Sequence, residues 1–132
     1  MKFDIGIVGD IKIYEQNRLP AHSDHQYYSS ADEAEAGGHE YTHSLNGLWK
    51  FYYAKNMSMI PDGFFETSFD VDVWDDIKVP AHIQMEGYGN PAYVNTQYPW
   101  DGLEEIDAPD LPKRINPVGC YVRTFHVPER FG

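Results

Sequence analysis

From residue 44 onward the chain alternates apolar and polar positions in short runs, the pattern of half-buried β-strands. In residues 48–53 (LWKFYY), Trp49, Phe51 and Tyr53 share one face of an extended strand, and the side chains between them share the other. No segment sustains a 3.6-residue apolar period, so we expect little helix. The strands predicted by this pattern cover residues 48–53, 69–73, 77–79 and 120–127.

Proline and glycine residues separate these runs. Pro61-Asp62-Gly63 predicts a turn. The long segment 100–116 is acidic and contains prolines, which predicts a loop. Many short strands joined by such loops predict an all-β fold of the β-sandwich or jelly-roll kind. The chain stops soon after the last predicted strand, so we expect only the first part of a jelly roll in residues 41–132.

Residues 1–40 differ from the rest and are predicted to form an extended N-terminal arm that ends in a linker. Residues 1–13 are mixed in character and have room for one short strand. Residues 31–40 are acidic, small and glycine-containing. A short helical turn is expected over residues 30–36, because Ser30 can cap it and Glu33 follows three residues later.

The formal net charge of −11 excludes several classes of partner. A surface this acidic repels the phosphates of nucleic acids and of anionic membranes, so we expect neither as a partner. Neutral ligands such as sugars are compatible with it. Aromatic residues make up 15% of the chain, and their flat amphipathic rings suit both a β-rich fold and a sugar-binding surface.

Cys120 is the single cysteine, so the chain has neither an intrachain disulfide nor a thiolate metal cluster, and a buried, unreactive thiol is expected. This composition favours a reducing, cytoplasmic location. The N-terminus has no long apolar run and no small-residue cleavage site, both of which a secretory signal requires. No stretch approaches the ~20 apolar residues that span a membrane.

Four segments carry a family resemblance: residues 17–23 (NRLPAHS), 44–51 (SLNGLWKF), 79–99 (VPAHIQMEGYGNPAYVNTQYP) and 116–128 (NPVGCYVRTFHVP). In this order they resemble the N-terminal region of β-galactosidases of glycoside hydrolase family 2, of the lactose-operon type. Two positions depart from the family pattern. Ile83 stands where the family usually has Trp, and Val94 stands where it commonly has Thr. The loop over residues 100–115 is also longer than in some members.

The resemblance implies a multidomain retaining glycoside hydrolase. In that family a galactose-binding-like jelly roll comes first, immunoglobulin-like domains follow, and a TIM barrel carries the active site. The chain is then expected to be truncated, holding the arm and about half of the jelly roll. The family's two catalytic glutamates lie in the barrel, so we expect no catalytic residue here and no activity from the chain alone.

The resemblance also implies partners and cofactors. Family members often use Mg²⁺ and Na⁺ ions, but we expect this part of the enzyme to hold no cofactor. The expected partners are a β-galactoside, the remaining domains of a parent chain and further copies in a homo-oligomer. The arm is expected to contact the parent chain or a neighbouring subunit, with Arg18 and Leu19 as its anchors.

Asn95 is the residue that the resemblance most strongly implicates in substrate binding. The matching Asn of the family reaches the mouth of the active site and hydrogen-bonds the galactosyl group. An amide suits this role because it both donates and accepts, as sugar hydroxyls do, while an Asn that caps a turn is the structural alternative. Trp100 is a second substrate-binding candidate, by stacking on a sugar face. Tyr93 and Tyr98 are expected to pack in a core or against the barrel.

The other polar clusters are expected to have neither a catalytic nor a metal-binding role. The adjacent carboxylates of Asp75-Asp76 and Glu104-Glu105 point to opposite faces of an extended chain, and both pairs are predicted to be solvated loop charge. Four histidines of the arm region have no recognised ligand spacing, so no metal site is predicted. These are His22, His25, His39 and His43.

Two functions other than an enzyme part stay open at this point. One is a freestanding carbohydrate-binding module, for which a complete jelly roll would be expected. The other is a structural or assembly fragment that contributes only packing. Within the enzyme class, residues 87–99 resemble the galactosidase type more than its β-glucuronidase or β-mannosidase relatives.

Overall fold

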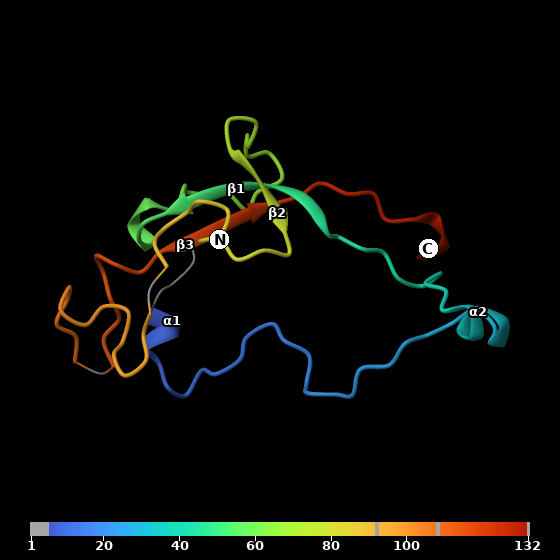
Figure 1. Ribbon diagram of the computed structural model, residues 1–132, viewed down its shortest axis with the longest axis horizontal. Helices are drawn as coiled ribbons and strands as arrows, with labels where there is room; N and C mark the ends of the chain where they lie inside the picture. Colours follow the sequence, from blue (N-terminus) through green and yellow to red (C-terminus); the bar gives the residue numbers. More distant parts are fainter. Residues whose placement is uncertain (1–5, 92, 108, 132) are drawn as a thin grey trace.

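The computed structural model describes residues 6–91, 93–107 and 109–131 of the chain. Its strands form one antiparallel sheet in the order β2-β1-β3, as Figure 1 shows. The described elements are α1 (Gly6–Gly9), α2 (Ala31–Ala36), β1 (Gly47–Ala54), η1 (Met57–Met59), β2 (Asp75–Val79), β3 (Val118–Val122) and η2 (Glu129–Phe131), where η marks a 3₁₀ turn. The prediction of an all-β chain with little helix is confirmed. The described residues form a single open sheet and not the two sheets of a sandwich.

Strand β1 lies at the centre of the sheet and keeps the predicted alternation. Trp49 lies opposite Ile77 across the β1–β2 pairing. Phe51 lies opposite Asp75 on that side and opposite Tyr121 on the other. Phe51 and Ile77 are each 1% exposed and form the core on this face. The Phe51 and Tyr121 rings are 4.8 Å apart between centroids, a separation typical of stabilising aromatic pairs.

The opposite face of the sheet is covered by the loop over residues 60–74. Trp74 packs against Tyr52 of β1, with ring centroids 5.4 Å apart. Phe64 and Phe69 pack against Trp74 at 6.1 and 5.7 Å. Cys120 lies opposite Tyr52 in the β1–β3 pairing and is buried, so the expectation of a buried thiol is confirmed. Aromatic rings from one loop therefore close this side of the core.

The strand predicted at residues 69–73 is not formed, and a loop takes its place. The Asp70 carboxylate accepts the Asp72 N–H at 2.9 Å, and the Trp74 N–H donates to the Val71 carbonyl at 3.0 Å. Local hydrogen bonds of this kind compete with strand pairing. The segment instead packs on the sheet by its aromatic side chains, among them Phe69 against Trp74.

Strand β3 ends at Val122, whereas the sequence pattern predicts a strand up to residue 127. The cause lies in Arg123, which follows directly. Its guanidinium donates to the carbonyls of Leu45 and Asn46, in the segment that precedes β1. Arg123 also lies over the Trp49 ring, 5.9 Å from its centroid. These contacts hold the chain beside the start of β1 instead of continuing the ladder.

The N-terminal part of the chain has little contact with the sheet. Helix α1 lies where a short strand was predicted over residues 1–13, of which residues 1–5 lie outside the described part. The chain then runs in an extended path away from the sheet to α2, as Figure 1 shows, and residues 10–30 are all exposed. The predicted helical turn is confirmed, because Ser30 caps α2 by accepting the Glu33 N–H at 3.1 Å.

Candidate functional site

The loop that follows β2 is fastened to the core by Tyr88. The Tyr88 ring packs on Phe51 with 4.6 Å between centroids, and its hydroxyl donates to the Asp75 carboxylate at 2.8 Å. Burial, followed by the hydrogen bond to Asp75, raises the pKa of Tyr88 to about 12, since both disfavour the phenolate. The neutral phenol therefore holds the start of the loop that carries the candidate residues.

Gly89 allows this loop to pass close to β1. Its φ is +68°, a left-handed conformation that favours glycine. A Cβ at this position would lie 2.8 Å from the Tyr53 hydroxyl oxygen. Any side chain here would therefore meet both a strained backbone and a steric overlap with the central strand.

Asn95 and Tyr93 lie in the outward part of the loop. Asn95 is exposed, as a side chain that meets a ligand has to be. Tyr93 is 90% exposed, so the described residues do not provide the core in which it was expected to pack. Its contact with a barrel stays a prediction.

Tyr98 and Trp100 form a stacked pair, with ring centroids 4.9 Å apart and planes 5° from parallel. Tyr98 is 66% exposed, whereas Trp100 is half-buried. The described residues therefore do not provide the core in which Tyr98 was expected to pack, and its contact with a barrel stays a prediction. Each ring covers one face of the other, so the flat surface left for the apolar face of a sugar ring is an outer face of the pair, and Tyr98 has the more exposed ring. Asn95 and Trp100 lie five residues apart in the same loop.

The carboxylates of the first adjacent pair, Asp75 and Asp76, do not point to a common site. Asp75 and Asp76 begin β2, so the prediction that they lie in a polar loop is wrong. Neighbouring residues in a strand point to opposite faces of the sheet. Asp75 accepts the Tyr88 hydroxyl, and Asp76 forms an ion pair with Lys50 at 3.2 Å.

The second pair lies in a loop as predicted, but Glu104 is not a merely solvated charge. Its carboxylate accepts the backbone N–H groups of Lys113 at 2.9 Å and Arg114 at 3.0 Å. These bonds hold the pKa of Glu104 below its ordinary value. A general acid at neutral pH needs a raised pKa, so Glu104 is suited to holding the loop. No local sequence signal points to this role, because its partners lie nine and ten residues away.

Two of the four histidines predicted to have no metal-binding role lie within hydrogen-bonding distance of other groups of the arm region. His22 lies 2.9 Å from the Pro20 carbonyl, and His39 lies 3.1 Å from the Gln26 amide. Within residues 6–131, apart from positions 92 and 108, no three His, Cys, Asp or Glu side chains gather as metal ligands would. That this part of the enzyme holds no Mg²⁺ or Na⁺ ion stays a prediction. None of the helices in this described part is long and apolar enough to cross a membrane.

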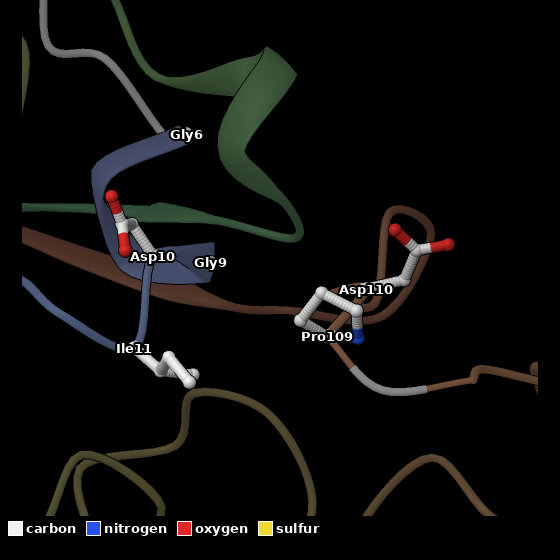
Figure 2. A pocket seen from close by; sticks show the side chains of 6 residues that line it. All are labelled: Gly6, Gly9, Asp10, Ile11, Pro109 and Asp110. Carbon is white, nitrogen blue, oxygen red and sulfur yellow. The ribbon is translucent and has the colours of Figure 1, made fainter.

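A shallow hollow lies between the N-terminal segment and the loop before β3, and sequence reasoning did not anticipate it. Figure 2 shows the residues that line it, which are Gly6, Gly9, Asp10, Ile11, Pro109 and Asp110. The two carboxylates do not point toward one another, and none of the six lining residues is aromatic. Neither Asn95 nor Trp100 lines this hollow, so it is separate from the candidate site.

Residues 42–131 match the family model described as "Glycosyl hydrolases family 2, sugar binding domain". The chain belongs to glycoside hydrolase family 2. The family resemblance of the four sequence segments is thereby confirmed. The single antiparallel sheet and the scarcity of helix are consistent with such an all-β domain.

Similar proteins in this family are named β-galactosidases. The chain is 51% identical over 120 residues to the β-galactosidase of Halalkalibacterium halodurans, and that match covers 90% of the chain and 12% of the relative. It is 43% identical to the β-galactosidase of Streptococcus thermophilus, over 89% of the chain and 12% of that relative. It is 36% identical to the β-galactosidase large subunit of Leuconostoc lactis, over 99% of the chain and 23% of the subunit. The chain thus spans a small part of the length of its relatives.

Proposed function

We propose that this chain is the N-terminal sugar-binding and assembly part of a β-galactosidase, which hydrolyses terminal non-reducing β-D-galactose residues in β-galactosides. The observation that carries the proposal is the 51% identity to a named β-galactosidase over 90% of the chain. The match to the family's sugar-binding domain over residues 42–131 supports the sugar-binding role. Reaction chemistry is assigned to parts of the enzyme outside this chain.

The absence of catalytic carboxylates is supported by what the paired acidic residues do. A retaining glycosidase needs two carboxyl groups roughly 5 Å apart on either side of one bond. Asp75 and Asp76 leave β2 on opposite faces and bind Tyr88 and Lys50. Glu104 is engaged by backbone N–H groups that keep it ionised. The chain by itself is therefore expected to be inactive.

Asn95 is proposed to hydrogen-bond the galactosyl group, and Trp100 to contribute an aromatic surface beside it. The proposal rests on the exposure of Asn95 and on the stacked Tyr98–Trp100 pair in the same loop. The amide can donate to one sugar hydroxyl and accept from another. Each ring covers one face of the other, so a sugar can stack on Trp100 only from the side away from Tyr98, and the more exposed Tyr98 ring offers the other outer face.

The proposed partners are the remaining domains of the parent chain and further copies of the whole enzyme. The exposed arm supports this, since an extended segment is ordered only when it lies on another surface. Leu19 is 73% exposed and is proposed to be an anchor together with Arg18. Any Mg²⁺ or Na⁺ ion of the enzyme is proposed to bind other parts of it. A cytoplasmic location is supported by the lone buried Cys120, which has no partner for an intrachain disulfide.

The test is hydrolysis of a chromogenic β-galactoside by the purified chain, alone and mixed with the Halalkalibacterium halodurans enzyme lacking its matching N-terminal residues. We expect no activity alone and activity after mixing. Asn95→Ala should reduce the activity of the mixture about tenfold, the effect of losing a hydrogen bond worth about 1.4 kcal/mol. Asn90→Ala, an exposed Asn of the same loop, is the matched control. Turnover by the chain alone, free of host enzyme, would refute the proposal.

The stacked pair also favours a second candidate, a carbohydrate-binding module that acts without a hydrolase. Such a module binds galactose or lactose by itself, because its whole site lies in the chain. Calorimetric titration of the chain with lactose decides between the two. Binding in the millimolar range or tighter that Trp100→Ala abolishes supports the module, and no binding supports the enzyme part.

A further inference from the structure

The Tyr98–Trp100 pair is carried by two consecutive backbone turns. The Asp101 N–H donates to the Tyr98 carbonyl at 3.0 Å, and the Asp101 carboxylate accepts the Tyr98 N–H at 2.9 Å. The Leu103 and Glu104 N–H groups both donate to the Trp100 carbonyl, at 2.9 and 3.0 Å. The backbone of each ring residue is therefore hydrogen-bonded to an acidic residue three or four positions later in the chain.

Glu104 also closes the base of the loop that follows. Its two carboxylate oxygens accept separately from the Lys113 and Arg114 N–H groups. The Ile115 amide adds a third favourable interaction with the same carboxylate. Successive backbone N–H groups that face one anion form a small concave binding site, and hydrogen bonds to an ionised acceptor are stronger than neutral ones.

The segment that receives Glu104 is fixed to the sheet. Pro112 is buried. The Asn56 side-chain amide, just after β1, donates to the Arg114 carbonyl at 3.5 Å. A continuous chain of contacts thus leads from the end of β1 through Arg114 and Glu104 to the Trp100 carbonyl.

We propose that Glu104 is the positioning residue of the Tyr98–Trp100 pair, because its carboxylate ties the turns that carry both rings to the segment that is bound by Asn56, just after β1. This inference rests on the proposed function only in that the pair is taken to meet the sugar. Without the carboxylate, the turns keep their own hydrogen bonds but lose their attachment to residues 113–115. The rings then change position relative to the sheet.

The backbone N–H groups of Lys113 and Arg114, which donate to Glu104, favour its ionised form. The lowered pKa keeps the carboxylate charged at neutral pH, and Gln in its place retains the shape but loses the charge and one acceptor. The charged residues of this loop and of the segment facing Glu104 are Asp101, Glu105, Asp107, Asp110, Lys113 and Arg114.

The experiment uses ¹⁹F NMR of the chain labelled with 5-fluorotryptophan, which gives separate signals for Trp49, Trp74 and Trp100. Trp100→Phe assigns the third signal by its loss. In Glu104→Gln we expect the Trp100 signal to shift by more than its linewidth while the other two stay in place. Glu105→Gln, which changes the neighbouring charge, is the matched control and should leave all three unchanged. An unshifted Trp100 signal in Glu104→Gln overturns the proposal.

A pH titration of the unsubstituted chain keeps the test decisive if Glu104→Gln does not fold. The Trp100 signal should move alone as the pH falls below the ordinary carboxyl range, before the Trp49 and Trp74 signals change. Movement of all three signals together, or none of Trp100, overturns the proposal. No sugar is present in either measurement, so failure of galactoside binding would refute the proposed function and leave the role of Glu104 intact.

Discussion

The substitution Gly89→Ala adds one methyl group and tests how the loop that carries Asn95 and Trp100 packs on the sheet. Gly89→Ala introduces a Cβ at a φ of +68° and 2.8 Å from the Tyr53 hydroxyl oxygen. The left-handed backbone costs an alanine about 1–2 kcal/mol, and relieving such an overlap typically costs about 1–3 kcal/mol. We therefore expect the free energy of unfolding to fall by about 2–5 kcal/mol.

Two further substitutions separate the steric contribution from the backbone contribution. Gly87→Ala also has a positive φ, of +94°, but its Cβ meets nothing within 4 Å, so its cost is backbone strain alone. Tyr53→Phe removes the hydroxyl that the Gly89 methyl group would meet. Combined with Gly89→Ala it should return about 1–2 kcal/mol relative to the sum of the single variants. Combined with Gly87→Ala it should be additive within roughly 0.5 kcal/mol.

The assay is urea denaturation followed by tryptophan fluorescence, which reports on the buried Trp74 beside Tyr52. Midpoints are compared at constant m-value, so that a change in the denatured state is not mistaken for a change in stability. Additivity between Gly89 and Tyr53 would refute the close approach of the loop to β1. Equal coupling of Tyr53 to both glycines would show that the effect is not a local overlap.

Two predictions concern protonation and burial. The pKa of Tyr88 is about 12 in the folded chain and about 10 in an unfolded one, so its neutral form stabilises the fold fully below about pH 10. This stabilisation is lost as the pH rises from about 10 toward about 12. In Tyr88→Phe, urea denaturation should show a smaller loss of stability between about pH 10 and about pH 12. Part of the loss should remain, because burial also raises the pKa of Tyr121. If the variant loses as much stability over this range as the unsubstituted chain, Tyr88 is not the group responsible. Cys120 should react with a thiol reagent only after unfolding, because it is 1% exposed and burial raises its pKa, and rapid labelling of the native chain would contradict its packing.

Elements set by contacts between near neighbours could be predicted. The cap of α2 depends on Ser30 and Glu33, three residues apart, and it forms as expected. The alternation over residues 48–53 likewise places Phe51 on a buried face of β1. Residues 69–73 have the same kind of alternation and yet form a loop, in which the Asp70 carboxylate accepts the Asp72 N–H. Pattern alone does not tell which alternating segment finds a partner strand.

The candidate site divides in the same way. The family resemblance drew attention to Asn95 and Trp100, and the structure places both in the loop that Tyr88 fastens to the core. That Trp100 is half-buried and Tyr98 exposed could not be predicted, since the exposure of each ring depends on how the two stack. Glu104 was interpreted as solvated charge because nothing near it in sequence marks its partners.

The sequence by itself determined the family, the all-β character, the acidic surface and the segment that carries the candidate residues, because composition, alternation and motif order are properties of neighbouring residues. The tertiary structure decided which strands pair, that Arg123 ends β3, and that the carboxylates of Asp75 and Glu104 hold loops. Those outcomes depend on groups far apart in the chain, such as Arg123 and Leu45, which are 78 residues apart. Such contacts form only after the folded backbone has brought a donor close to an acceptor that would otherwise be unpaired.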